Sequence, residues 1–376
     1  MRDIRIQRWA QVLVNYSLDT KPGHKALIVG DTDALPLVEA CYEEFLKVGA
    51  LPEVMIRPGS WSEVFFQHAS EDLLKTTPPI MEYAAKHIDR YLKIGAESNS
   101  RLLSNVDPKK QTLVSKANTP ILESILGRAA KQEMRWSYTH FPTAAAAQDA
   151  EMGTREYEEF VFALGMLNEE NPAQKWKEVE KNHQNLMETL ATKKELRFQN
   201  KQGTDLRVNI EGMKWVNCCG RINFPDGEVY TGPNLSAKDG GVNGIARFSF
   251  PTIYRNVEVH DIELVFEKGA VVQAKASKGE PFLLEMIRQD QGSKFVGEIA
   301  LGTNYHMKQI TKNILFDEKF GGTFHLALGK GYPQTGNTNQ SALHWDMIFD
   351  LRNGGLVTAD GEVISENGKF VNPKWP

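Results

Sequence analysis

The sequence predicts an α/β N-terminal domain with a parallel, doubly wound type of sheet, followed by a β-rich α+β C-terminal domain that binds metal. The chain has 376 residues, more than one hydrophobic core usually organises. Its first half alternates short apolar runs with helical periodicity, whereas its second half alternates apolar and polar residues between turns. We therefore expect two domains, residues 1–185 and 186–376.

The parallel sheet is predicted from the first crossover. An apolar run, His24–Gly30, follows a Lys-Pro-Gly turn, and Asp31 or Asp33 can then cap a helix that ends at Val48. Leu51–Arg57 is the next expected strand, and a strand, helix and strand in so short a span imply a parallel right-handed connection. The first loop lacks G-x-G-x-x-G, so no dinucleotide is expected.

Helical periodicity returns in three later segments. Pro108–Lys131 is one, and Thr154–Leu167 is a second with Thr154 as its expected cap. The Lys/Glu-rich segment Pro172–Thr192 is expected to be a mostly solvated helix that contains the domain boundary. Beyond it, one helix is expected at Pro281–Gln289, and period-two segments predict antiparallel strands: Glu195–Asn200, Leu206–Ile210, Ile262–Phe266, Phe295–Ala300, Thr323–Leu328 and Leu343–Leu351.

Composition excludes several classes of function. The chain is 41% hydrophobic and 24% charged with a net charge of −4, and no Lys/Arg cluster is present, so neither nucleic acid nor an anionic membrane is an expected partner. No apolar run approaches the roughly 20 residues that span a bilayer. The three cysteines, Cys41, Cys218 and Cys219, give neither a disulfide framework nor a zinc knuckle. The cytoplasm is the expected location.

The strongest site signal is the segment around His344 and Asp346. Residues two apart on a strand share a face, so these two side chains would point together while Leu343, Trp345 and Met347 pack behind them. An imidazole and a carboxylate placed in this way can chelate a metal ion. An inert His–Asp pair at a sheet edge is the alternative.

Three further segments carry ligand-type side chains. His325 faces away from its apolar neighbours on a predicted strand, and the Gly-rich turn after it brings Tyr332 back towards it. Glu228 directly follows a Pro-Asp-Gly turn, and Glu298 interrupts a strand of small and apolar residues. Each of these residues is also compatible with a purely structural role. Cys218 and Cys219 are expected to be small strand residues near Glu228 rather than a redox pair or an extra metal site.

Taken together, two histidines and three carboxylates suit Zn²⁺, Co²⁺ or Mn²⁺, and a set this rich in carboxylates suits two ions. Such ions activate water and polarise a carbonyl, which amide hydrolysis requires. The motifs H-E-x-x-H and G-x-S-x-G are both missing, so helical zinc proteases and serine hydrolases lack support. Four other histidines have no carboxylate partner in a recognisable spacing: His24, His140, His260 and His306.

At these residues the chain resembles the thermophilic-type leucyl aminopeptidases, the aminopeptidase T family of metallopeptidases. The resemblance runs almost end to end and rests on these segments: Arg135–Trp136, Pro142–Gln148, Tyr157–Val161, Asn223–Val229, Gly297–Glu298, Asp317–Lys319, His325–Gly329, Tyr332 and Ser341–Asp346. It implies a two-metal site in the C-terminal domain and a homodimer that encloses the active sites. It also implies the metal ligands Glu228, Glu298, His325, His344 and Asp346, with Tyr332 as the active-site tyrosine.

The expected activity is release of N-terminal residues from peptides with a free N-terminus by a hydroxide that two metal ions activate. Glu298 or Glu228 would shuttle the proton, and Tyr332 would donate a hydrogen bond to the oxyanion. Two alternatives stay open. His325, His344 and Asp346 could hold a single Fe(II), as in the 2,5-dihydroxypyridine dioxygenases of the same fold. The chain could also bind metal or peptide without catalysis.

Overall fold

The computed structural model describes residues 3–255 and 257–376, and it divides into two compact units. The first contains the chain up to Lys175 together with Gly220–Pro225, and the second contains Trp176–Cys219 and Asp226–Pro376. The division falls near the start of helix α9 (Pro172–Leu190), which also contains the boundary expected near residue 185. That boundary for independent folding stays a prediction.

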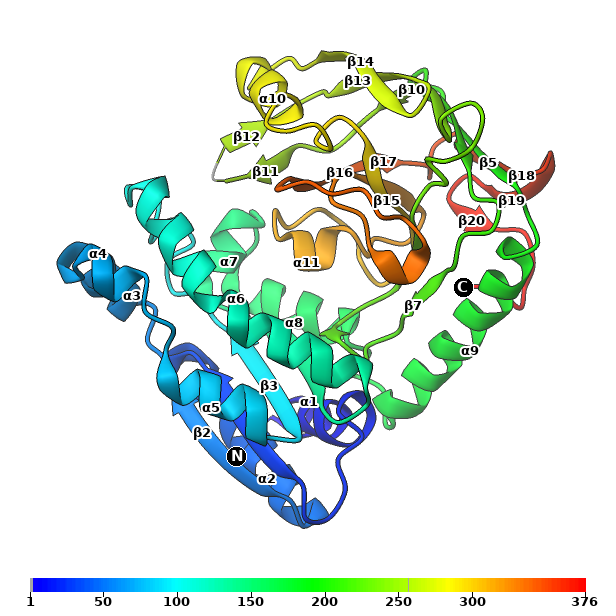
Figure 1. The fold of residues 1–376 in the computed structure, drawn as a ribbon. Coiled ribbons are helices and arrows are strands. Elements are labelled where there is room, and N and C mark those ends of the chain that lie inside the picture. The colour runs from blue at the N-terminus through cyan, green and yellow to red at the C-terminus, as the bar shows by residue number, and fades with distance from the viewer. Residues whose placement is uncertain (1–2, 256) are drawn as a thin grey trace. The chain divides into compact units, whose positions relative to one another are not determined.

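The first unit is built on a five-stranded parallel sheet, in the order β2-β1-β3-β4-β8 (Figure 1). Because β1 lies between β2 and β3, the chain winds in both directions from the middle, as the predicted doubly wound class requires. The fifth strand, β8, comes from Gly220–Pro225, the short segment in which the chain returns to the first unit. The strands are β1 Lys25–Gly30, β2 Leu51–Ile56, β3 Arg90–Gly95, β4 Arg135–His140 and β8 Asn223–Phe224.

Two helix starts in this unit differ from the expectation. Asp31 caps a short 3-10 turn through the Thr32 amide at 2.7 Å, and α2 begins only afterwards. Helix α8 is capped at Gly153, whose amide donates to Glu156 at 3.3 Å, so Thr154 is its first residue and not its cap. The helices are α1 Ile4–Gln11 with its π-turn Val12–Ser17, the 3-10 turn Thr32–Ala34, α2 Leu35–Val48, α3 Ser60–His68, α4 Glu71–Leu74, α5 Pro79–His87, α6 Pro108–Ala130, α7 Ala144–Asp149 and α8 Thr154–Leu164.

The second unit contains two large antiparallel sheets and a two-stranded ribbon. One sheet has the order β14-β13-β10-β6-β5-β18-β19-β20 and the other β17-β16-β15-β9-β7. All six predicted strands are present. The elements are β5 Glu195–Gln199, β6 Asp205–Asn209, β7 Val216–Cys218, β9 Glu228–Thr231, β10 Val242–Arg247, β11 Thr252–Tyr254, β12 Val257–Val259, β13 Glu263–Glu267, β14 Ala270–Lys275, α10 Glu280–Ile287, β15 Val296–Gly302, α11 Ile314–Asp317, β16 Thr323–Gly329, a 3-10 turn Pro333–Thr335, β17 His344–Asp350, β18 Leu356–Ala359, β19 Glu362–Glu366 and β20 Lys369–Phe370.

The core of the second unit lies between these two sheets. Phe198 of β5 meets Phe324 of β16 with their ring centroids 3.8 Å apart, and Phe349 of β17 packs against both rings. Every second residue along the strands of the five-stranded sheet therefore faces this core, as the two-residue period of a strand predicts. Its other face is left for polar side chains.

Helix α9 is more buried than its composition suggested. Trp176, Leu186 and Leu190 are almost fully enclosed, and so is His183. These four side chains recur at helical spacing among the charged residues and form one apolar stripe with a polar group in it. The expectation of a mostly solvated helix is therefore wrong for this face.

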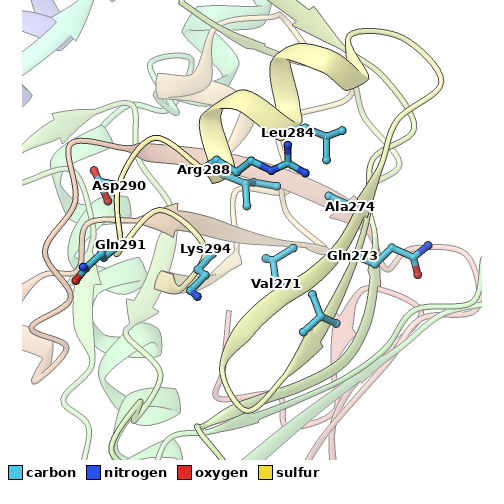
Figure 2. A pocket seen from close by; sticks show the side chains of 10 residues that line it. Val271, Gln273, Ala274, Leu284, Arg288, Asp290, Gln291 and Lys294 are labelled. Atoms are coloured by element: carbon cyan, nitrogen blue, oxygen red, sulfur yellow. The ribbon is translucent and has the colours of Figure 1, made fainter.

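A groove of about 510 Å³ lies between β14 and α10 (Figure 2). Val271, Leu284 and Ile287 supply apolar lining, and Arg288 and Lys294 supply positive charge. None of the candidate ligands lines this groove. Within the described part of the chain, no helix combines the length and apolar character that a membrane crossing requires.

Candidate metal centre

The polar face of the five-stranded sheet carries all five candidate ligands. Strand pairing places Ala300 opposite His325 and Ala327 between Glu298 and Asp346. Gly302 pairs with Glu228 and Gly329 with His344. Directly paired residues share a face in an antiparallel sheet, so the set points to one side of it: Glu228, Glu298, His325, His344 and Asp346. Four of the residues paired with them are glycine or alanine, namely Ala300, Gly302, Ala327 and Gly329, and these leave space between the candidate side chains. The larger paired residues are Cys218, opposite Glu228, and Ile348, opposite His325.

The imidazoles and carboxylates of this set lie within a few ångströms of one another. His325 Nε2 is 3.5 Å from Glu228 Oε2 and 3.7 Å from Glu298 Oε1. His344 Nε2 is 3.4 Å from Glu298 Oε2 and 3.7 Å from Asp346 Oδ2. The two oxygens of Glu298 thus face two different histidines. Such a carboxylate is placed to bridge two cations.

Backbone carbonyls fix which nitrogen each histidine turns to the cluster. Nδ1 of His325 donates to the carbonyl of Glu318 at 3.1 Å, and Nδ1 of His344 donates to the carbonyl of Lys330 at 3.0 Å. A carbonyl oxygen only accepts, so Nδ1 carries the proton and Nε2 of the neutral ring presents its lone pair. Histidines that bind metals are commonly held in this way.

The residues present fit divalent ions. Three buried atoms of the cluster have no hydrogen-bond partner among the described residues: Glu228 Oε2, His325 Nε2 and Asp346 Oδ1. A buried polar atom without a partner is costly, and three of them aimed at one another are what a cation would satisfy. Carboxylate oxygens with imidazole nitrogens suit Zn²⁺, Co²⁺ or Mn²⁺ better than softer ions.

The cluster creates a strongly negative potential. Burial alone would lower the pKa of His325, but contact with Glu298 and the charge of Glu228 outweigh it and raise the pKa to about 9. For His344, burial is likewise outweighed by contact with Glu298 and by the charge of Asp346, and its pKa rises to about 10. A divalent ion competes with these protons for Nε2.

Two residues beside the cluster, Glu318 and Lys319, were not among the candidate ligands. A carboxylate oxygen of Glu318 lies within 4.8 Å of ligand atoms of His325 and Asp346, so Glu318 can join the set. The buried ammonium of Lys319 contacts Glu228 and lies 2.6 Å from Glu318 Oε1. Both residues follow α11 on a turn, where no strand periodicity marks them. Their only signal was the Asp317–Lys319 segment in the family resemblance.

Tyr332 lies at the edge of this cluster, where its hydroxyl is 3.4 Å from His344 Nε2. Its ring lies 5.4 Å from that of Tyr230, whose hydroxyl accepts a hydrogen bond from Gln334 at 2.9 Å. Burial and the charges of Glu298 and Asp346 raise the pKa of Tyr332 well above its ordinary value. The phenol therefore keeps its proton and can donate it in a hydrogen bond.

The cysteines and the remaining histidines of the sequence analysis lie in different surroundings. Cys218 lies on β7 and pairs with Glu228, as expected for a strand residue near that turn, whereas Cys219 directly follows this strand, and none of the three cysteines is in a disulfide. His140 and His260 each have a carboxylate partner in the structure. Glu97 contacts His140 from the end of a neighbouring strand, and Glu258 lies 3.4 Å from His260 on the preceding strand. Neither pair has the spacing of a recognised sequence motif. Glu97 and His140 are far apart in the sequence and meet only through the tertiary structure.

A buried set of imidazoles and carboxylates on a rigid sheet is typical of metalloenzymes. Comparison with known protein families identifies which kind of metalloenzyme this is. Residues 2–370 match the thermophilic metalloprotease family (M29), and the chain belongs to it. It is therefore a peptidase that depends on divalent metal and acts on peptides.

Relatives of similar length support this membership. The chain is 28% identical to aminopeptidase AmpS of Bacillus subtilis, with 98% of each chain covered, and 26% identical to aminopeptidase 2 of Geobacillus stearothermophilus, with 97% of each covered. AmpT from Thermus thermophilus has the same fold, with a TM-score of 0.84 and 22% identity over 98% of this chain and 99% of that one. A 2,5-dihydroxypyridine dioxygenase from Pseudomonas putida shares the fold more distantly, with a TM-score of 0.63 and 14% identity over 98% and 97%.

Proposed function

We propose that the protein is an aminopeptidase that releases N-terminal residues from peptides with the help of two divalent ions. The observation that carries this proposal is Glu298, whose two oxygens face two different histidines. The proposed ligands are the residues of the sequence analysis with Glu318 added: Glu228, Glu298, Glu318, His325, His344 and Asp346. Zinc, cobalt and manganese all suit this set.

Charge supports two ions rather than one. The four carboxylates of the proposed set, Glu228, Glu298, Glu318 and Asp346, gather around the two histidines, with the first two buried and the other two largely enclosed. Two divalent ions carry as much positive charge as these four groups carry negative charge, whereas a single ion leaves two negative charges uncompensated. Uncompensated buried charge is expensive. Lys319 adds one positive charge and Asp226, 3.7 Å from it, adds one negative charge, so the sum is unchanged, although the ammonium also contacts Glu228 and Glu318.

When bound, the ions would supply Lewis acidity for the scissile carbonyl and lower the pKa of the attacking water. Both oxygens of Glu298 face histidines, whereas Glu228 turns only Oε2 towards one. We therefore assign the proton transfer to Oε2 of Glu228, which has no hydrogen-bond partner among the described residues. That oxygen would take the proton from water and pass it to the leaving amine. The Tyr332 hydroxyl would donate a hydrogen bond to the developing oxyanion.

Restriction to the N-terminus is supported by the chemistry of the cluster and by the relatives. A free α-amine is a ligand for the same ions and is attracted, as an ammonium, to a site dominated by carboxylates. The relatives described above are aminopeptidases by name. Anchoring of the amine at the ions would place the first peptide bond, and only that bond, beside the nucleophile.

The competing proposal is a mononuclear Fe(II) dioxygenase that uses His325, His344 and Asp346. Such a triad has no use for Glu228, Glu298 and Glu318, three buried carboxylates that one iron cannot balance. The dioxygenase neighbour shares only the fold at 14% identity. Oxygen uptake with a dihydroxypyridine, measured on iron-loaded protein, would favour this alternative over peptide hydrolysis.

The proposal is tested with Glu298→Gln. Wild-type protein purified without added metal should hydrolyse Leu-p-nitroanilide after zinc, cobalt or manganese is restored. Glu298→Gln should lose this activity by at least about 10²-fold together with bound metal, since the amide cannot bridge two ions as an anion does. The measurements are metal content per chain, turnover and the circular dichroism spectrum. A folded Glu298→Gln protein with full activity would refute the bridging role.

The family resemblance and the surface of the first unit support a homodimer. Ile80 and Tyr83 on α5 and Leu122 and Leu126 on α6 are about half exposed or more, on two helices that pack against each other (Figure 1). Exposed apolar side chains gathered in this way mark association surfaces. Ile80→Glu should shift a dimer towards monomer in light scattering, whereas Val363→Glu, at an exposed position on β19, should not. A dimer unaffected by Ile80→Glu would place the interface elsewhere.

The cytoplasm is the proposed location. It rests on Cys41 and Cys218, which form no disulfide, as is usual in a reducing compartment.

A further inference from the structure

Lys319 is a lysine enclosed by acids. Its side chain is 3% exposed, and its ammonium contacts Glu228 Oε1 and lies 2.6 Å from Glu318 Oε1 and 3.7 Å from Asp226 Oδ1. Lysine is rarely buried to this degree unless it is paired. Here a single ammonium is shared among three carboxylates, two of which belong to the proposed metal ligands.

This ammonium lies against a further group of possible ligands. Cys218, Asp226 and Glu228 offer ligand atoms that all lie within 4.8 Å of one another. Cys218 and Glu228 are directly paired on β7 and β9, so their side chains share a face. Thiolate and carboxylate ligands at this spacing can bind zinc or cobalt. Lys319 contacts two of the three.

We propose that Lys319 is a positioning residue whose ammonium replaces a third metal ion beside the two-metal centre. It occupies the space among Cys218, Asp226 and Glu228 with a cation that is covalently part of the chain. The proposal rests on the proposed function, because it concerns the ligands of those two ions. It adds a role for Lys319 and a reason why Cys218 stays out of the metal chemistry.

The ammonium has two effects on the ligands. By holding Oε1 of Glu228 it leaves Oε2, the oxygen without a hydrogen-bond partner, turned to His325. By holding Oε1 of Glu318 it fixes a second carboxylate near the same histidine. A third metal ion could be lost or exchanged and would compete for both carboxylates. The ammonium of Lys319 cannot leave the site, because it is covalently attached to the chain.

The test compares Lys319→Ala with Lys319→Met, using Co²⁺ alone as the probe. The alanine removes the charge and opens the space, so this variant should bind one more cobalt ion per chain than wild type. That ion should show thiolate-to-cobalt charge-transfer absorption in the near ultraviolet, because Cys218 would release its proton and bind. The methionine removes the charge but fills the space, so it should show neither change. Both variants should lose activity by roughly 10- to 100-fold.

Two controls separate this effect from general damage. The double variant Lys319→Ala/Cys218→Ser should lose the charge-transfer band. Lys193→Ala removes another largely enclosed lysine of the same unit, one that pairs with Glu362 at 2.5 Å, and should behave as wild type. Lys319→Ala without the additional ion, or with an ion but no thiolate band, would overturn the proposal.

Cys218→Ser alone gives an answer even if Lys319→Ala does not fold. The proposal expects this variant to keep the cobalt content and activity of wild type, because Lys319 already occupies the position. Loss of an ion from Cys218→Ser would show that the thiol is a ligand in the natural protein and would overturn the inference. Wild-type protein that binds no divalent ion would instead refute the proposed function.

Discussion

Tyr332 is the residue whose protonation state is decided most clearly by its surroundings. Its phenol is enclosed and lies near the negative charges of Glu298 and Asp346, and both conditions oppose ionisation. A protonated phenol beside His344 is a hydrogen-bond donor in a site otherwise rich in acceptors. The oxyanion of a tetrahedral intermediate needs such a donor.

Tyr332→Phe removes this donor and leaves the ring in place. We expect kcat to fall by about 10²-fold or more, the loss that removal of one oxyanion donor commonly causes. Metal content should not change, because the phenol is not a proposed ligand. Steady-state kinetics on Leu-p-nitroanilide, with metal analysis of the same sample, checks both statements. A variant that loses metal instead of kcat would make Tyr332 a structural support of His344.

The orientation of single side chains could be predicted from the sequence where they lie on strands with a two-residue period. His344 and Asp346 share a face with Trp345 buried behind them, as period two requires. Glu318 and Lys319 could not be found in this way, because they lie on a turn. Their position depends on Asp317, whose buried carboxylate accepts hydrogen bonds from the amide and hydroxyl of Thr311, each at 2.7 Å.

Among the elements, α9 connects to the candidate site through a buried histidine. Nδ1 of His183 lies 2.8 Å from Asn217 Oδ1 on β7, and Nε2 lies 2.8 Å from Thr303 Oγ1 just after β15. Both β7 and β15 belong to the sheet that carries the ligands. His183 therefore joins the helix to two strands of the site.

His183 should make stability depend on pH. Burial lowers its pKa to about 4, below the ordinary 6.5, so the folded protein holds this ring neutral while the unfolded chain protonates it. Its contribution is present above pH 6.5 and is lost as the pH falls from 6.5 towards 4, by ~3 kcal/mol. Urea unfolding of wild type and His183→Gln between pH 7 and 4 measures it. A wild-type decline no steeper than that of His183→Gln would contradict the assignment.

The elements with strong periodicity were predictable, and the short ones were not. All six expected strands of the second half and the helices α6, α8 and α10 are present with small shifts at their ends. Strand β8 has only two residues, Asn223–Phe224, and β7 has three, too few to show a period. The buried stripe of α9 was hidden because charged residues dominate its composition.

At the scale of the whole molecule, the proposed ions would contribute to stability as well as chemistry. Without cations, the carboxylates of the second unit repel one another in a buried space. Ligands that bind only the folded state stabilise it, by roughly 2.7 kcal/mol for a site at one hundred times its Kd. We therefore expect the bound ions to stabilise the fold of this unit.

A chelator should accordingly lower the Tm, and restored zinc or cobalt should return it. Differential scanning calorimetry of the same sample before and after chelation gives the measurement. The matched control is Glu298→Gln, whose Tm should respond less because it has less metal to lose. Quantitative removal of metal with an unchanged Tm would mean that the ions do not stabilise the fold.

The late return of the chain to the first unit affects how the protein can be divided. Strand β8, which borders β4, is encoded more than thirty residues after the end of α9 at Leu190. A recombinant fragment that stops after α9 would lack it and expose the hydrogen-bonding edge of β4, and exposed edges recruit other chains. Domain dissection should therefore keep the segment around Phe224 or supply it as a separate peptide.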